Sequence, residues 1–114
     1  MLQELFDFLE ALFVGERVEL SYGDKVTGPG FSVVFYEDGT DVDRNLDGTA
    51  NLLIGTYVVQ IWHDSLLEAK EKSDILFQAM EGTKFQILSM TPIRVDGNKR
   101  KWHQQIVVQI MEDA

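Results

Sequence analysis

The stretch from residue 52 to residue 82 constrains the fold most, because a strand pattern passes directly into a helix pattern there. Residues 54–62 are rich in β-branched and aromatic side chains, which favours a strand that ends near His63. Ser65 and Glu68 have the spacing of a capping box, in which each side chain satisfies a backbone donor at a helix start. The sequence therefore predicts a long strand followed at once by a helix.

The predicted helix has one apolar stripe and a clear end. The residues on the stripe are Leu66, Ala69, Ser73, Leu76, Phe77 and Met80. Gly82 stands where a helix commonly ends in a left-handed residue. We therefore expect about four to five turns at ~3.6 residues per turn, with the stripe turned toward a core.

The other segments alternate in type. Residues 2–14 repeat apolar side chains at three- and four-residue spacing before Gly15, which predicts a first helix. Strand patterns occupy residues 18–22, 31–36, 85–95 and 102–111. Pro92 interrupts the third of these and indicates an edge strand or a bulge, and the turn at 96–98 indicates a hairpin. The glycine-rich residues 23–30 are predicted to form a loop.

This order of elements predicts the fold class. A chain of 114 residues is long enough to bury one sizeable core, so we expect a single domain over residues 1–114. The strand-helix-strand unit with an antiparallel return implies an α+β fold. We expect one mixed or antiparallel sheet with both helices packed on one face.

Composition excludes several function classes. The net charge of −9 disfavours gripping nucleic acid, although an acidic surface suits a channel along which DNA slides, and it also keeps a protein in solution. The absence of cysteine removes disulfides and thiolate chemistry. Acids in the first helix make a poor signal peptide, and no apolar run approaches the ~18 residues of a membrane span. We expect a cytosolic chain at synthesis.

Charge is distributed unevenly along the chain. Residues 37–47 carry five acids against Arg44, a net charge of −4, and we expect residues 37–51 to form a long, mobile acidic loop. The acids are Glu37, Asp38, Asp41, Asp43 and Asp47. Residues 94–101 carry four bases against Asp96, a net charge of +3. The bases are Arg94, Lys99, Arg100 and Lys101. These two patches are candidates for a contact between copies, and both are also compatible with ordinary solvated surface.

Asp43, Asn45 and Asp47 match the opening of a calcium loop, with Gly48 in the turn position. The match fails at the twelfth position, where Ile54 replaces the bidentate carboxylate. A calcium- or small-ligand-binding module that uses residues 41–51 is therefore the alternative function.

A weaker third class is a hydrolase around His63 and Asp64. Ser65 is better explained as a helix cap than as a nucleophile, and Asp64 as an acid favoured by the helix dipole. His63 and His103 are the only histidines, which is fewer than a catalytic zinc site requires. No cofactor is expected.

The pattern from residue 31 to residue 111 resembles the tail terminator and minor capsid proteins of long-tailed bacteriophages. The segments that carry the resemblance are VVFYEDGTD, GTYVVQIWHDS, EAKEKSDILFQAMEG, the Pro92 strand, the Gly97 turn and the final VVQI. The family has an α+β fold and assembles as a ring at the head-proximal end of the tail.

The resemblance implies a structural protein rather than an enzyme. It would form a homo-oligomeric ring, a hexamer by analogy, that caps the tail tube and offers a surface to the head connector. The ring would assemble in the host bacterial cytoplasm and remain in the virion. DNA would pass through it without specific binding, and no membrane is involved.

Overall fold

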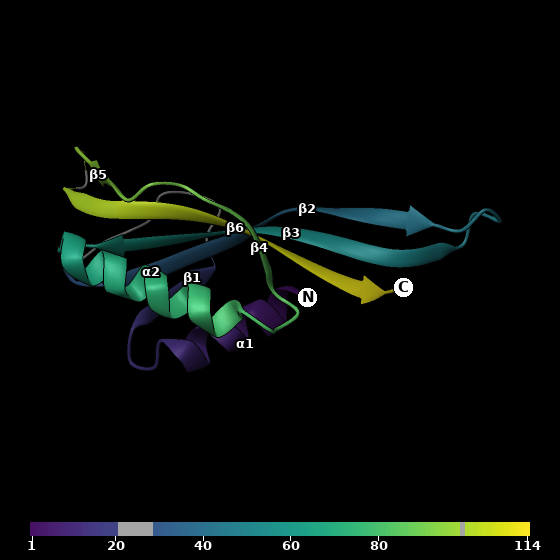
Figure 1. Cartoon of the computed structure of the whole chain (residues 1–114), viewed down its shortest axis with the longest axis horizontal. Coiled ribbons are helices and arrows are strands. Elements are labelled where there is room, and N and C mark those ends of the chain that lie inside the picture. Colours follow the sequence, from purple (N-terminus) through teal and green to yellow (C-terminus); the bar gives the residue numbers. More distant parts are fainter. Residues whose placement is uncertain (21–28, 99) are drawn as a thin grey trace.

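The computed structural model describes residues 1–20, 29–98 and 100–114, and these form the helices and strands labelled in Figure 1. In chain order the elements are α1 (Leu2–Leu12), β1 (Arg17–Leu20), β2 (Ser32–Arg44), β3 (Ala50–His63), α2 (Leu66–Met80), β4 (Gln86–Met90), β5 (Arg94–Asp96) and β6 (Lys101–Asp113). Most of the predicted loop at 23–30 lies outside the described residues, as do Tyr22 and Lys99.

The strands form one mixed sheet in the order β1-β2-β3-β6-β4, with β5 also paired to β6. β1 runs parallel to β2, whereas β2, β3, β6, β4 and β5 pair antiparallel. β4 and β5 follow each other along one edge of β6, and Pro92 separates them because it cannot donate to a strand ladder. The predicted interruption of an edge strand at Pro92 is therefore confirmed.

Both helices cover the same face of the sheet (Figure 1) and share one core with it. Leu5 and Leu9 of α1 lie in one apolar cluster with Leu76 and Met80 of α2. The sheet contributes Val33, Phe35, Tyr57, Val59, Ile61, Ile106, Val108 and Ile110 to this cluster. These positions alternate along β2, β3 and β6, as expected for side chains that share one face. The predicted α+β fold with two helices on one face is confirmed.

The corner between β3 and α2 is present as predicted, with one difference in its polar contacts. Oγ of Ser65 accepts a hydrogen bond from the Glu68 backbone N–H at 3.4 Å, so Ser65 is the N-cap. The Glu68 carboxylate lies 2.7 Å from Nε2 of His63, instead of returning to the cap backbone. Gly82 has φ +77°, the left-handed conformation expected after the helix.

The buried stripe of α2 is narrower than predicted. Ala69, Ser73, Leu76 and Met80 are buried, and the Ser73 hydroxyl donates to Oε1 of Gln104 at 2.6 Å. Leu66 and Phe77 are each 42% exposed, so the prediction was wrong for both residues. Phe77 lies about 100° around the helix from the buried Leu76, at the margin of the buried stripe.

Residues 37–51, predicted as a long acidic loop, instead belong to a β-hairpin over residues 37–57, which we name the arm. It continues β2 and β3 beyond the helices (Figure 1), with cross-strand pairs from Gly39–Thr56 to Arg44–Ala50. The loop prediction was wrong because Asp, Asn and Gly have low strand propensity on their own. Pairing overrides that propensity here, since β6 holds the other edge of β3.

Gly55 allows this long central strand to pass beneath an aromatic ring. A Cβ on Gly55 would lie 2.8 Å from Cε2 of Tyr57 and 3.2 Å from Sδ of Met1. The Tyr57 side chain, two residues away on the same face, is buried and covers the glycine backbone. The glycine that looks like a weak point in the strand pattern is therefore a packing requirement.

Candidate functional site

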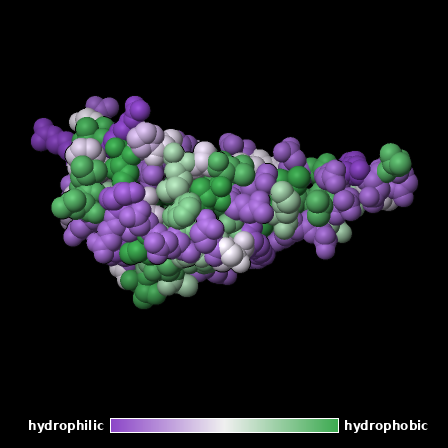
Figure 2. Space-filling view, in the orientation of Figure 1, coloured by the Kyte–Doolittle hydropathy of each residue, from purple (hydrophilic) through white to green (hydrophobic). Residues whose placement is uncertain are grey.

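The arm is the most prominent surface feature, and it gives the molecule extents of 52 × 27 × 23 Å. Figure 2 shows it as a narrow projection from a broader body, mainly hydrophilic along its length and with a hydrophobic group at its end. Its tip is a tight turn, in which the Asn45 N–H donates to the Thr49 carbonyl at 2.8 Å. The Gly48 N–H donates to the Asn45 carbonyl at 2.9 Å, and Gly48 has φ +87°.

All five acids of the predicted patch lie on the arm. Glu37 and Asp38 stand at its base, where a β-bulge shifts the register, and Oε1 of Glu37 accepts from the Thr40 hydroxyl at 2.6 Å. Asp41 and Asp43 pair across the strands with Ile54 and Leu52, on the face opposite to Tyr57 and the helices. Asp47 lies in the tip turn. The five acids fall on one projection but not on one face of it.

These acids also suit an exposed strand edge. β1 pairs with β2 from Ser32 to Phe35, so within the described chain the outer edge of β2 is open from Glu37 to Arg44. Charged side chains and bulges commonly prevent such an edge from pairing with other chains. An edge-protecting role requires charge of either sign, whereas an assembly role requires negative charge.

The candidate calcium ligands are engaged in local hydrogen bonds. Oδ2 of Asp43 accepts from the Asn51 amide at 3.0 Å, and the Asn45 amide donates to the Thr49 hydroxyl at 3.1 Å. Oδ1 of Asp47 accepts from the Thr49 hydroxyl and backbone N–H, and these bonds lower the pKa of Asp47. Among the described residues no three His, Asp or Glu side chains converge as metal ligands would.

The predicted basic patch lies at the opposite end of the molecule, on the β5–β6 hairpin (Figure 1). Arg94 and Arg100 are exposed there, and Lys99 lies outside the described residues. Lys101 does not belong to the exposed patch, because its side chain is buried. Its Nζ lies 2.8 Å from Oδ1 of Asp64 and donates to the Gly30 carbonyl at 3.2 Å. The patch formed by Arg94 and Arg100 is hereafter the basic hairpin.

His63, Asp64 and Ser65, the residues considered for a hydrolase, make local contacts at the corner between β3 and α2. The backbone N–H of Ser65 donates to Nδ1 of His63 at 3.0 Å, while the Ser65 hydroxyl caps α2. The Gly30 N–H and then the Lys101 ammonium lower the pKa of Asp64. A nucleophile needs its hydroxyl directed at the base, and here the backbone of Ser65 makes the contact with the imidazole.

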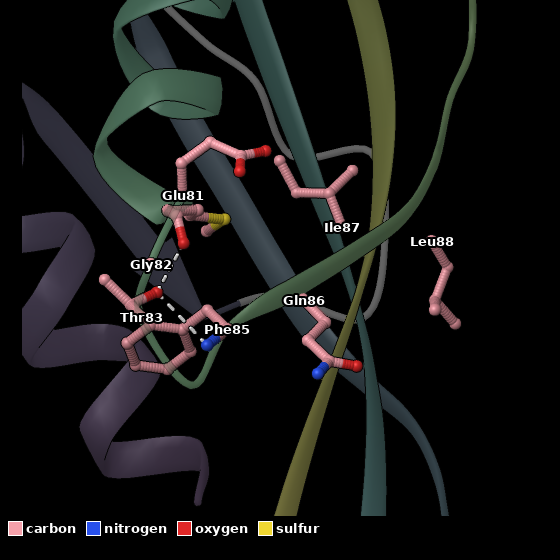
Figure 3. A pocket seen from close by; sticks show the side chains of 8 residues that line it. Glu81, Gly82, Thr83, Phe85, Gln86, Ile87 and Leu88 are labelled. Carbon is pink, nitrogen blue, oxygen red and sulfur yellow. Dashed lines mark hydrogen bonds between the residues drawn. The ribbon is translucent and has the colours of Figure 1, made fainter.

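A hollow of about 400 Å³ lies beside the turn between α2 and β4 (Figure 3). The Thr83 hydroxyl donates to the Met80 carbonyl at 2.7 Å and accepts from the Phe85 N–H at 3.2 Å, which closes this turn. Among the described lining residues, Glu81 is the one titratable group.

Sequence reasoning missed the strongly exposed apolar residues Leu46 and Val95, which stand among the charged patches. Leu46 stands in the tip turn of the arm, and Val95 stands in the basic hairpin with 58% of its surface exposed. The available signal was an isolated apolar residue inside a polar turn. Such a residue becomes informative only when its exposure is known.

Comparison with known proteins adds no relative, since no family model and no curated protein matches this sequence. No described helix combines the length and the apolar character that crossing a membrane requires. Function is therefore inferred from the residues and their arrangement in this chain.

Proposed function

We propose that the protein is a structural, non-enzymatic component of a long-tailed bacteriophage, which caps the tail tube as a ring. The ring would also form the joining surface for the head connector. The resemblance over residues 31–111 supports this proposal, and the α+β fold agrees with it. The observation that carries the ring is the placement of opposite charges at opposite ends of one elongated chain.

The geometry favours a head-to-tail contact. The arm carries the acids and the basic hairpin carries Arg94 and Arg100, and the two surfaces lie at the two ends of the long axis (Figure 1). Different patches that meet between copies make a heterologous contact, which gives a closed ring when the rotation between neighbours closes. The resemblance sets the expected number of copies at six.

Charge also fits the proposed position at a DNA conduit. The chain carries a net charge of −9, and outside residues 37–47 (−4) and 94–101 (+3) the remaining residues still carry −8. A negative wall repels the phosphate backbone, so DNA would slide past it without being held. Specific nucleic-acid contacts are not required for this role.

The test is the mass of the assembled protein in solution. We expect native mass spectrometry to find a hexamer of about 78 kDa, six times the chain's 13.0 kDa, at low ionic strength. The contact should weaken with salt, because the Debye length falls from ~10 Å at 0.1 M to ~3 Å at 1 M. A protein that stays monomeric up to about millimolar concentration at low salt would contradict the ring.

Two matched variants show whether assembly depends on the basic hairpin or only on the net charge of the chain. Arg94→Glu reverses an exposed charge in the basic hairpin, and Lys70→Glu reverses an exposed charge on α2, where Lys70 pairs with Asp74 of the same helix. Both change the net charge equally. We expect Arg94→Glu to abolish the oligomer and Lys70→Glu to preserve it. Lys101 is unsuitable for this test, since reversing a buried charge beside Asp64 would disturb the fold.

A further inference from the structure

Leu46 is a fully exposed apolar side chain on a fixed support. Its relative exposure is 111%, and it stands in the tip turn that Asn45 and Thr49 close by backbone hydrogen bonding. The Arg44 guanidinium donates to the Gly48 carbonyl at 3.0 Å, which ties the two sides of the turn further. A large apolar group held at the end of a two-stranded projection is presented for contact with another molecule.

A hollow of matching character lies at the other end of the molecule. It has a volume of about 430 Å³, within the ~300–1,000 Å³ typical of binding pockets. Pro92, Val95 and His103 supply apolar and aromatic lining. The His103 ring stacks on the buried Trp62 ring with centroids 4.4 Å apart, which gives this side of the hollow a rigid support.

The charges around the two features are complementary. Asp43 and Asp47 flank Leu46 on the arm, whereas Arg94 lines the hollow and Arg100 stands exposed nearby on the same hairpin. Asp96 also lines the hollow, but its Oδ1 accepts a hydrogen bond from the Asn98 N–H at 2.9 Å. One end of the molecule thus has an acidic knob with an apolar tip, and the other end has an apolar hollow with a basic rim. The two features are complementary in charge and in apolar character.

We infer that Leu46 of one copy inserts into the hollow beside Val95 of the next copy. This inference rests on the proposed ring, and it identifies the knob and the socket of that contact. Insertion removes the apolar surface of both residues from water, while the surrounding charges set the orientation. A copy cannot fill its own socket, because the two features lie at opposite ends of a 52 Å axis.

Cysteine cross-linking tests the contact directly, since the chain contains no cysteine. In the double variant Leu46→Cys/Val95→Cys every disulfide must join two copies. We expect mild oxidation to give a ladder of covalent oligomers that ends at the closed ring. The control is Leu46→Cys/Leu67→Cys, since Leu67 is an equally apolar residue on α2 that is 82% exposed and lines a neighbouring hollow beside Pro92 instead of this one. Cross-linking of the control as efficient as that of the test pair would overturn the inference.

Association measurements separate this inference from the ring itself. Leu46→Ala should weaken association at least about tenfold, the effect of no longer burying one leucine, while Leu67→Ala should leave it unchanged. Val95→Ala should weaken association as well, but less than additively with Leu46→Ala, because the two residues touch. If the wild type forms a ring and Leu46→Ala forms it equally well, the role of Leu46 in the contact is refuted but the proposed ring is not. A wild-type chain that never associates would refute both.

Discussion

Nζ of Lys101 lies 2.8 Å from Oδ1 of Asp64, and this pair joins the start of β6 to the corner between β3 and α2. The Lys101 side chain is 7% exposed, whereas that of Asp64 is 49% exposed. The Gly30 N–H donates to Oδ2 of the same aspartate at 2.7 Å. One carboxylate thus gathers three segments that are distant in sequence, and it accounts for a lysine that does not reach the basic surface.

Removing this carboxylate should destabilise the fold. Asp64→Ala leaves the Lys101 ammonium and the Gly30 N–H without that acceptor. We expect the free energy of unfolding to fall by about 1–3 kcal/mol, less than for a fully buried ion pair, because the aspartate is half in solvent. The comparison is Asp74→Ala, which breaks the exposed Lys70–Asp74 pair and should cost at most about 0.5 kcal/mol. Urea unfolding measures both changes. Equal midpoints for the two variants would contradict the assigned role of Asp64.

Acid should remove the contribution of Asp64 in a defined range. The pKa of Asp64 is lowered in the folded protein, so the unfolded chain binds more protons as pH falls past its ordinary value of about 3.9. The stabilisation is therefore complete above about pH 4 and is lost as pH falls through the folded pKa. Urea unfolding at several pH values should show a shallower acid decline for Asp64→Asn than for wild type. Parallel declines would show that the carboxylate is not responsible.

Gly55→Ala should destabilise the protein although alanine is tolerated in most strands. The added Cβ would lie 2.8 Å from Cε2 of Tyr57, whose ring is buried and cannot move freely, so we expect a loss of about 1–3 kcal/mol. Gly39→Ala is the matched control, because a Cβ there meets no atom within 4 Å. It should change stability by less than about 0.5 kcal/mol. Thermal unfolding distinguishes the two substitutions, and a similar loss for both would contradict the packing argument.

Much of the fold could be predicted from the sequence, because local patterns and burial agree there. The passage from β3 to α2 follows from Ser65 as cap and Gly82 as terminator, and both were found in those roles. Pro92 marked the break between β4 and β5 correctly. The arm could not be predicted, because its strands owe their order to β6, which lies more than fifty residues further along the chain.

The candidate site was predicted in composition but not in arrangement. The sequence indicates an acidic and a basic segment, and only the fold places them at opposite ends of the molecule. Counting charges along the sequence assigned Lys101 to the exposed basic patch. Its side chain is instead buried, where it binds Asp64, 37 positions away in the sequence. Leu46 and Val95 gave no periodic signal, because each stands alone in a turn or a very short strand.

Calcium should bind the arm only weakly. Asp43 and Asp47 already accept local hydrogen bonds, and the bidentate carboxylate of a calcium loop is replaced by Ile54. We expect no site tighter than roughly 10⁻⁴ to 10⁻³ M, so about 1 mM calcium would add at most about 1.4 kcal/mol of stability. Calorimetric titration with calcium and with magnesium checks this. A micromolar one-to-one calcium site that Asp43→Ala removes would favour the binding-module alternative.

The central claim is that the arm of one copy contacts the basic hairpin of the next through opposite charge. Asp38→Lys/Asp41→Lys/Asp43→Lys changes the net charge of residues 37–47 from −4 to +2, so both ends of that variant are basic. Arg94→Glu/Arg100→Glu changes the net charge of residues 94–101 from +3 to −1, so both ends of that variant are acidic. Neither variant should assemble alone. The lysines still protect the open edge of β2, so edge protection by itself does not account for a loss of assembly.

Mixing the two variants in equal amounts is the most direct measurement. Each arm then meets a hairpin of opposite charge, and an even-numbered ring can alternate the two chains throughout. We expect native mass spectrometry to show two monomeric variants that together form a mixed oligomer of the wild-type size, with equal numbers of each chain. A mixture that remains monomeric while the wild type forms rings would contradict the contact between the arm and the basic hairpin.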